Sequence, residues 1–400
     1  MEIAVIGGGA SGFMAAITAK QTNPNARVTI FEKTDKVLSK VKISGGGRCN
    51  VTNATFSVSQ LIKNYPRGGK KLKKSFNLFN TNHTIDWFEK RGVRLKTEAD
   101  NRMFPQSNTS ETIINCLVET AESLKIRLSY KSKVTAINPT DKGIELDINE
   151  QKLLFDKVII ASGGTPKKEG LNWLKDLGYS IVNPVPSLFT FNLANKDICK
   201  LMGLSIPKAI ATIKGSKLKQ EGAMLITHWG LSGPSILKLS AWGAEELAKR
   251  NYNFTVGVNW LAINEEELRV QFSTITASRK LMHKHNPFDV PKRLWKFILD
   301  KLEISDSQIW GELTKKNKNR LINTLINDAF EVRGKTTFKE EFVSCGGINL
   351  SDINMNTMES KLHKGVYFAG EILNIDGVTG GFNFQAAWTT GYLAGKNSAI

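Results

Sequence analysis

The sequence contains few of the residues that bind metals or form disulfide bonds. Its four cysteines are widely spaced and include no C-x-x-C pair, and its five histidines show no spacing typical of metal ligands. This composition predicts no metal site and favours a reducing compartment, which we expect to be the cytoplasm. No segment approaches the roughly 20 consecutive apolar residues of a membrane span, so we expect no membrane partner.

Acidic residues are also scarce beside basic ones. The 400 residues include 55 Lys and Arg against 37 Asp and Glu, which gives a formal net charge of +18. Such an excess favours a polyanionic partner such as nucleic acid. A lysine-rich background composition explains the same excess, so the charge alone leaves both interpretations open.

The start of the chain carries the pattern of a dinucleotide-binding turn. Residues 3–6 predict a short apolar strand, and a helix follows the glycine-rich turn. Gly7, Gly9 and Gly12 fit the G-x-G-x-x-G fingerprint, whose glycines allow a tight turn, the approach of a pyrophosphate and close helix–strand packing. The helix N-terminus offers free N–H groups to the phosphates. Glu32 ends the next predicted strand, where an acid is expected to bind a ribose hydroxyl.

The C-terminal segment has the pattern of the flavin-binding half of the same site. A predicted strand ends in a turn and an acid before Gly380 and Gly381, and a helix over 386–394 follows. The N-terminus of that helix is suited to stabilise negative charge on a reduced flavin ring. The two glycines allow close backbone approach, and we expect Asn383 and Gln385 to hydrogen-bond the ring edge.

The pattern between these two segments changes twice. Alternating strands over 126–155 fit the excursion from the cofactor domain found in two-dinucleotide-binding-domain flavoproteins. Further on, short strands and turns are followed by a basic helical stretch, and glycine-rich sequence then resumes. We therefore predict an α/β fold with a discontinuous Rossmann-like cofactor domain and an insert. The predicted parts are 1–188 and 342–400 for the cofactor domain and 189–341 for the insert, which is β-rich over 189–262 and helical over 263–335.

Taken together, these residues make the chain resemble the HI0933-like (YhiN/BaiN) family of FAD-dependent oxidoreductases over essentially its whole length. The motifs that carry the resemblance are 42–50 (KISGGGRCN), 227–234 (THWGLSGP), 346–348 (GGI), 357–361 (TMESK) and 365–385. The resemblance implies an FAD-binding domain of the two-dinucleotide-binding type and a β-barrel-like insert with helices. One branch of the family resembles ribosomal dihydrouridine synthases, which reduce a uridine of 23S rRNA with FAD and NADH. Another branch reduces bile-acid intermediates, and many members carry the name aminoacetone oxidase.

The motifs give a set of expected cofactor contacts. In the first part of the chain they are Gly7, Gly9, Ala10, Ser11, Gly12, Glu32, Lys33, Lys42, Ser44, Gly45, Gly46, Arg48, Cys49 and Asn50. In the remainder they are Val134, Ala161, Ser162, Gly163, Gly370, Glu371, Asp376, Gly380, Gly381, Phe382, Asn383 and Gln385. Because there is one glycine fingerprint, NADH or NADPH is expected to bind transiently as electron donor, without a Rossmann domain of its own.

Reduction of a uracil by hydride transfer to C6 also needs an acid that protonates C5. Cys49 and His228 are the candidate acids, because each lies in a signature motif. Arg48 is expected to lower the pKa of the Cys49 thiol or to hold a cofactor or substrate oxygen. Each residue has a structural alternative: a packed thiol, a turn histidine and a surface ion pair, respectively.

Two basic segments favour RNA as the substrate. Residues 63–74 contain no acid and include Tyr65, with Phe76 and Phe79 close behind, so they predict either a phosphate-binding surface with stacking aromatics or a solvated helix face with its aromatics in the core. Residues 279–301 form a second basic run in the insert. The predicted RNA contacts are Lys63, Arg67, Lys70, Lys71, Lys73, Lys74, Arg279, Lys280, Lys292 and Arg293.

We therefore expect reduction of a uridine in 23S rRNA, with the base drawn out of its stack to reach the flavin. Two other classes remain open. One is a small-molecule flavin reductase or oxidase that acts on a steroid-like enone or an amine, with incidental positive charge. The other is an RNA-binding protein whose FAD is structural.

Overall fold

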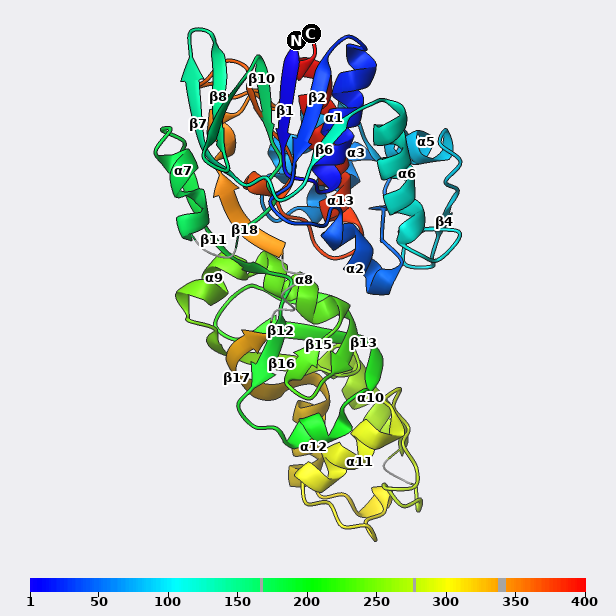
Figure 1. Ribbon diagram of the computed structural model, residues 1–400. Coiled ribbons are helices and arrows are strands. Elements are labelled where there is room, and N and C mark those ends of the chain that lie inside the picture. The colour runs from blue at the N-terminus through cyan, green and yellow to red at the C-terminus, as the bar shows by residue number, and fades with distance from the viewer. Residues whose placement is uncertain (166–167, 276–277, 337–342) are drawn as a thin grey trace. The chain divides into compact units, whose positions relative to one another are not determined.

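The computed structural model describes residues 1–165, 168–275, 278–336 and 343–400, which form two compact units (Figure 1). The first unit contains residues 1–187 together with the described residues after 342. The second contains the chain from Leu188 to residue 336. The first division lies beside the predicted boundary at 188/189, and the predicted boundary at 341/342 touches residues outside the description.

The first unit is built on a five-stranded parallel sheet in the order β19-β10-β1-β2-β6. Its strands are β1 (Glu2–Ile6), β2 (Arg27–Phe31), β6 (Arg127–Ser129), β10 (Lys157–Ile160) and β19 (Val366–Phe368). The central strands are almost entirely apolar, as expected for a parallel sheet that is covered on both faces. Figure 1 shows both chain ends beside this sheet, where Asn23 donates a hydrogen bond to the carbonyl of Ala399 at 3.4 Å.

Two helices from opposite ends of the chain pack directly on each other in this unit. They are α1 (Ala10–Thr22) and α13 (Phe382–Ser398). A Cβ added to Gly391 would lie 2.5 Å from the carbonyl oxygen of Ser11, and one added to Gly395 would lie 2.2 Å from that of Ala15. The two glycines therefore allow a backbone approach that a larger residue excludes.

Smaller sheets and helices complete the first unit. The antiparallel sheets are β3-β5-β4 (Thr52–Asn53, Arg102–Pro105, Leu95–Thr97), β7-β8-β9 (Val134–Thr140, Gly143–Ile148, Gln151–Phe155) and β11-β18 (Ile181–Ser187, Val343–Ile348). The further helices are α2 (Ser39–Gly47), α3 (Val58–Leu61), α4 (Gly69–Leu78), α5 (Thr81–Glu89), α6 (Glu111–Ser123) and α7 (Asn172–Lys175).

The second unit is a closed six-stranded barrel with helices. Its strands follow the order β12-β15-β14-β13-β16-β17 (Thr190–Leu193, Gly230–Ser232, Lys219–Ile226, Ser205–Ile213, Asn253–Asn259, Asp328–Thr336). Its helices are α8 (Pro234–Trp242), α9 (Ala244–Lys249), α10 (Glu265–Ile275), α11 (Lys292–Lys301) and α12 (Lys315–Asn327). One apolar core joins the barrel to the helices and includes Trp260, Trp295 and Trp310.

This architecture confirms the predicted fold class, a Rossmann-like domain with a β-barrel and helical insert. One part of the prediction needs correction. The end of the expected helical part, 263–335, is the strand β17, whose residues alternate between buried and exposed from Asp328 to Arg333. That period of two is the pattern of a strand with one buried face, and the strand pairs with β12 and β16 to close the barrel.

Among the described residues, we find no helix that is both long enough and apolar enough to cross a membrane.

The contact between α1 and α13 predicts the effect of one methyl group. Gly395→Ala should lower the free energy of unfolding by about 1–3 kcal/mol, because the new Cβ overlaps the Ala15 carbonyl. The sign of this change in the free energy of unfolding is informative, because a Gly→Ala substitution in an exposed helix raises stability by about 1 kcal/mol. Denaturant titration checks it, with Lys396→Ala as the exposed control on the same turn. A Gly395→Ala protein as stable as wild type would show that the helices can separate without cost.

Candidate cofactor site

The glycine turn between β1 and α1 closes tightly against two other strands. The Gly7 N–H donates to the Phe31 carbonyl at 2.8 Å, and Gly7 has a φ of +110°. A Cβ at Gly7 would lie 2.4 Å from the Ala161 carbonyl oxygen, and a Cβ at Gly12 would lie 2.0 Å from that of Gly7. Both glycines are therefore required by the fold itself.

Gly9 differs from these two glycines because nothing crowds it. A Cβ built at Gly9 would meet no atom of the described residues within 4 Å, and its φ of −93° and ψ of −173° suit any residue. Gly9 is also the N-cap of α1, and no described side chain caps that helix. The first N–H groups of α1 thus have no side-chain cap, and the uncrowded position of Gly9 lies beside them, which is an arrangement suited to a phosphate.

Glu32 lies beside this turn, as its position in the sequence predicts. One carboxylate oxygen accepts from the Gly8 N–H at 2.9 Å, and the other accepts from the N–H and the hydroxyl of Thr34, both at 2.9 Å. These bonds fix the carboxylate at the end of β2. A carboxylate oxygen has further acceptor capacity, so the contacts are compatible with a ribose hydroxyl as an additional donor.

The loop of the first signature motif follows α2 and leaves helical geometry at Ser44, Gly45 and Gly46. Gly45 is held against Phe104, since its Cβ would lie 2.9 Å from that ring. Cys49 is fully buried with a φ of +60°, and burial raises the pKa of its thiol to about 12. The expectation that Arg48 lowers this pKa is therefore wrong, because desolvation dominates and Ser44 supplies the opposing hydrogen bond.

Arg48 points instead into a cluster of charged and aromatic side chains. Its guanidinium donates to Glu98 at 2.6 Å and lies over the Phe104 ring, 4.0 Å from the centroid. Arg102 shares Glu98 at 3.2 Å and also pairs with Asp100 at 2.6 Å. The ion-pair alternative for Arg48 thus describes its contacts in this structure, and one third of its side chain stays exposed.

The polar residues of the C-terminal motif are largely used within the protein. The Gln385 side chain is fully buried, accepts from Thr52 at 2.6 Å and Thr84 at 3.0 Å, and donates to Thr389 at 3.1 Å. The Asn383 amide makes two hydrogen bonds to the backbone of Gly377, at 2.8 and 2.9 Å. We therefore correct the prediction for Gln385, because its buried amide is bonded within the protein. The partly exposed Asn383 amide keeps a second N–H, and its contact with the flavin ring edge stays a prediction.

Asn50 joins the first motif to the last. The amide orientation that satisfies its neighbours has the oxygen accepting from the Gly381 N–H at 2.9 Å and the nitrogen donating to the Thr52 carbonyl at 3.0 Å. A Cβ at Gly381 would lie 2.4 Å from that same carbonyl oxygen. The start of α13 is therefore fixed against the loop that ends at Asn50, which brings the two predicted halves of the site together.

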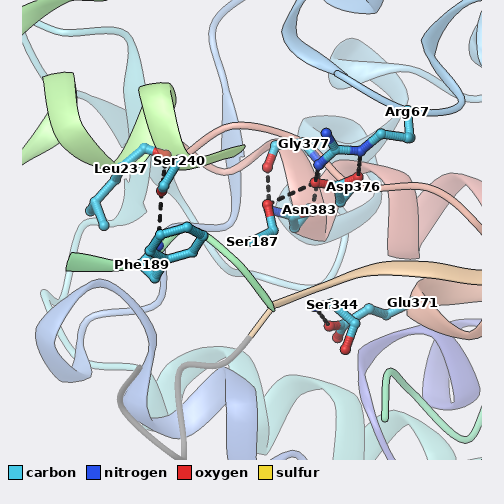
Figure 2. Close-up of polar contacts among 10 residues, drawn as sticks. All are labelled: Arg67, Ser187, Phe189, Leu237, Ser240, Ser344, Glu371, Asp376, Gly377 and Asn383. Carbon is cyan, nitrogen blue, oxygen red and sulfur yellow. Dashed lines mark hydrogen bonds and ion pairs between the residues drawn. The ribbon is translucent and has the colours of Figure 1, made fainter. Parts of the chain in front are cut away.

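Two carboxylates of the C-terminal segment hold the strands β11 and β18 (Figure 2). Asp376 is fully buried, forms an ion pair with Arg67 and accepts from the Ser187 hydroxyl at 2.8 Å. Burial raises its pKa, while Arg67 and Ser187 oppose that shift. Glu371 accepts from the Ser344 N–H at 2.7 Å.

These contacts change the expected roles of three residues. The prediction that Arg67 contacts RNA is wrong, because its guanidinium forms an ion pair with Asp376 and only 12% of its side chain is exposed. Asp376 has the same ion pair and is not available to a cofactor. Glu371 also forms an ion pair with Lys40 at 2.6 Å. Its side chain stays partly exposed beside Gly370.

The remaining expected cofactor contacts lie in varied surroundings. Lys33 is exposed, and Lys42 pairs with Glu111 at 3.1 Å on the surface. Val134 is half-buried at the start of β7, Ala161 is buried, and Ser162 and Gly163 follow β10 in more open positions. Phe382 is buried against Tyr65, whose hydroxyl donates to its carbonyl at 2.7 Å. His228 belongs to the second unit, where it is exposed in the turn between β14 and β15.

The structure separates the lysines of the first basic segment from its aromatics. Tyr65, Phe76 and Phe79 are 0–3% exposed, so they belong to the core and cannot stack on bases. The lysines of α4 and Lys63 are exposed and form no ion pair with any described residue. The predicted contacts with this exposure are Lys63, Lys70, Lys71, Lys73, Lys74, Arg279, Lys280, Lys292 and Arg293.

Sequence reasoning missed the partners that hold these motifs. Thr52, Thr84 and Thr389 surround Gln385, and Glu98 holds Arg48. All but Thr389 lie far along the chain from the residue they contact, so no local spacing marks them. Gln385 and Thr389 are four residues apart on one helix face, and that spacing was the one available signal.

A family model described as the HI0933-like protein Rossmann domain matches residues 1–397. The chain belongs to this family. The 3-dehydro-bile acid delta(4,6)-reductase of Clostridium scindens is 27% identical over 409 residues, which cover 100% of this chain and 99% of that protein. The ribosomal RNA dihydrouridine synthase of Escherichia coli is 26% identical over 405 residues, covering 98% of this chain and 96% of that protein.

Solved structures agree with the family assignment at the level of the fold. The 3-ketosteroid-delta4-(5alpha)-dehydrogenase from Rhodococcus jostii superimposes with a TM-score of 0.53 at 15% identity, covering 100% of this chain and 97% of that one. The first unit is thus a Rossmann-type FAD-binding domain, and the HI0933-like chain is a member of an FAD-dependent oxidoreductase family.

The residues present in the HI0933-like chain fit FAD. The open space at Gly9 and the uncapped start of α1 suit the pyrophosphate, and Glu32 is beside them for a ribose. Gly46, Gly47 and Gly163 also have no described atom within 4 Å of a built Cβ. Recognition of the cofactor therefore falls mainly on backbone groups and on Glu32.

Gly9 gives a test that separates binding from folding. Gly9→Ala should lower FAD affinity roughly 5- to 150-fold, which corresponds to an overpacking cost of about 1–3 kcal/mol where the pyrophosphate approaches. Titration followed by flavin absorbance measures it, and the stability of the FAD-free chain should fall by no more than the roughly 1 kcal/mol of an N-cap change, because the Cβ meets nothing. Gly12→Ala is the contrasting control, which should destabilise the FAD-free chain itself. Unchanged FAD affinity in Gly9→Ala would place the pyrophosphate elsewhere.

Proposed function

We propose that this protein reduces the C5–C6 double bond of a uridine in 23S rRNA, with NADH or NADPH as electron donor through FAD, in the cytoplasm. Bound FAD supplies a group that accepts a hydride from a nicotinamide and passes it to a polarised double bond. The observation that carries the proposal is the exposed, unpaired basic surface, because a structured RNA gives it a role. The dihydrouridine synthases among the relatives support the same choice.

The basic surface of the first unit centres on α4. Lys70, Lys71, Lys73 and Lys74 project from this helix while Leu72 and Phe76 are buried beneath them. Phosphate contacts from such lysines give affinity that does not depend on sequence and that falls as salt rises. The helix therefore presents a surface for the sugar–phosphate backbone, without stacking by its aromatics.

The second unit adds basic residues around α11. Arg279, Lys280, Lys292 and Lys296 are exposed and have no ion pair with any described residue. The apolar face of α11 is buried through Leu294, Trp295, Ile298 and Leu299, which leaves its basic face in solvent. Both units thus carry cationic faces suited to a large polyanion.

The two candidate acids differ in access. Cys49 keeps its proton because burial raises its pKa to about 12, but its side chain has no exposed surface. His228 is exposed, next to the ring of Trp229. We retain both as candidate donors of the proton to C5 and expect Arg48, one third exposed, to hold an oxygen of the cofactor or substrate.

A second candidate function is reduction of a steroid-like enone. The relative from Clostridium scindens favours it, because that match spans the whole chain at an identity similar to that of the dihydrouridine synthases. A steroid requires an apolar pocket and gives no role to the lysines of α4. For that reason we place it second.

The substrate is tested with the FAD-loaded protein, NADH and 23S rRNA that lacks dihydrouridine. We expect NADH to bleach the flavin absorbance without oxygen and rRNA to gain dihydrouridine, detected by mass spectrometry of nucleosides. Bleaching without dihydrouridine, together with reoxidation by a steroid enone, would favour the second candidate. The absence of bleaching by NADH and by NADPH would instead indicate a structural FAD.

The α4 lysines predict a salt-dependent contribution to RNA binding. Joint change of Lys70, Lys71, Lys73 and Lys74 to Gln should weaken rRNA binding and flatten its salt dependence, since the slope of log K against log salt scales as roughly −0.7 per contact on single strands. Flavin reduction by NADH should not change. The charge-matched control changes four exposed lysines elsewhere in the same unit to Gln: Lys125, Lys131, Lys133 and Lys142. An equal loss in both variants would show that overall charge, and not this surface, binds the RNA.

A further inference from the structure

An exposed pair of aromatic rings lies at the tip of the turn between β14 and β15. Trp229 is 42% exposed, whereas Trp260, Trp295 and Trp310 of the same unit are 0–2% exposed. Its ring centroid lies 4.3 Å from that of His228, with an interplanar angle of 43°. The fold therefore leaves the Trp229 indole partly in solvent, as it does that of Trp242, which is 39% exposed on α8, while it buries the other three in a core.

The backbone around this indole is fixed by hydrogen bonds. The Trp229 N–H donates to the Thr227 hydroxyl at 3.2 Å, and its carbonyl accepts from Leu193 N–H at 3.0 Å and Lys196 Nζ at 2.6 Å. A Cβ at the next residue, Gly230, would lie 2.3 Å from the Phe191 carbonyl oxygen, so the turn is packed directly on β12. A ring that projects from such a turn binds a partner without first ordering its own backbone.

Cationic side chains lie on and beside the segment 196–200, which contacts the turn through Lys196. Lys196 reaches the Trp229 carbonyl, and Arg293 at the start of α11 donates to the Lys200 carbonyl at 3.3 Å. Lys200 pairs with Asp197 at 3.0 Å, while Lys196 has no acidic partner among the described residues. We refer to His228, Trp229, Lys196, Lys200 and Arg293 as the Trp229 surface.

We infer that the Trp229 surface binds single-stranded RNA, with an unpaired base stacked on the Trp229 indole and the adjacent phosphates beside Lys196 and Arg293. Exposed aromatic faces flanked by lysine and arginine are how proteins hold unpaired bases, because every base offers a π-face and every nucleotide a phosphate. In a duplex these faces are covered by neighbouring bases. The inference rests on the proposed function, which supplies RNA as the partner, and it adds a surface that selects unpaired segments.

The charge distribution favours this occupant over a protein or an apolar ligand. The Trp229 surface comes from residues 196–200, 228–229 and 293, which the structure describes, and Asp197 is the one acid among them. Asp197 is paired with Lys200, so the net charge of the surface is positive. The aromatic area is a single indole with its neighbouring imidazole, which suits one base. A protein partner of ordinary affinity needs a larger contact.

The test compares binding of a short fluorescent oligouridine with binding of a duplex RNA of the same length by the FAD-loaded protein. Trp229→Ala and Trp229→Leu should each bind the oligouridine about 5- to 150-fold more weakly, which is the loss expected for one stacked base. Trp229→Phe should retain most of the affinity, and duplex binding should change little in any variant. Oligouridine should also quench wild-type tryptophan fluorescence more than that of Trp229→Ala. Trp242→Ala is the matched control, since Trp242 is 39% exposed on α8 of the same unit.

The possible failures are distinguishable. If the wild-type protein forms dihydrouridine in rRNA but Trp229→Ala and Trp229→Leu bind oligouridine as tightly as wild type, the stacking inference is overturned. Equal oligouridine affinity of the Trp229→Leu and Trp229→Phe variants would also overturn it, because apolar area and not an aromatic ring would then hold the ligand. If the wild-type protein binds oligouridine through Trp229 but forms no dihydrouridine, the proposed function fails while the surface stands.

Discussion

The first unit depends on backbone contacts that only glycine allows. Within the turn at the start of the chain, a Cβ at Gly12 would overlap the carbonyl oxygen of Gly7. Between the start of the chain and its end, a Cβ at Gly391 would overlap the carbonyl oxygen of Ser11, and one at Gly395 would overlap that of Ala15. These contacts let α13 lie directly on α1, and α1 in turn begins at the turn that faces the cofactor. The same glycine-rich turn therefore serves two demands. Gly7 and Gly12 allow the close packing, and Gly9, where a built Cβ would meet no described atom, leaves room for a ligand.

Because the segments pack so closely, most polar side chains between them are used to satisfy one another. Gln385 binds three threonines, and Asp376 binds Arg67 and Ser187 in the interior. A buried group left without such a partner costs about 1–3 kcal/mol, and more when it is charged. These side chains are consequently poor candidates for binding a cofactor. Binding of FAD falls on groups that the fold leaves open, chiefly the first N–H groups of α1 and the loops around Gly46 and Gly163.

What the sequence predicted well was periodic or local. The strand, turn and helix at Gly7–Gly12 and the change to short strands in the insert follow from patterns within single segments, whereas the barrel was implied by the family resemblance. What it missed were contacts between distant residues. Arg67 looked like part of a lysine-rich surface, and its partner, Asp376, lies 309 positions away. Gln385 looked free in the motif, but Thr52 and Thr84 approach it only after the chain has folded. A polar residue in a signature motif thus identifies a site region without identifying what the side chain itself binds.

The aromatic residues illustrate the same limit and point to its physical cause. Tyr65 and Phe76 lie among lysines in the sequence, but the helical segment that carries them has an apolar face that must be buried, so the rings turn inward and the lysines outward. A ring on an amphipathic helix is therefore a poor stacking surface, however basic its neighbours. Trp229 does not have to be buried in this way, because it lies in a tight turn whose backbone is fixed by hydrogen bonds and not by apolar packing. For a basic protein of this fold, we therefore expect an unpaired base to be held by aromatic residues in rigid turns and not by aromatic residues within basic helices.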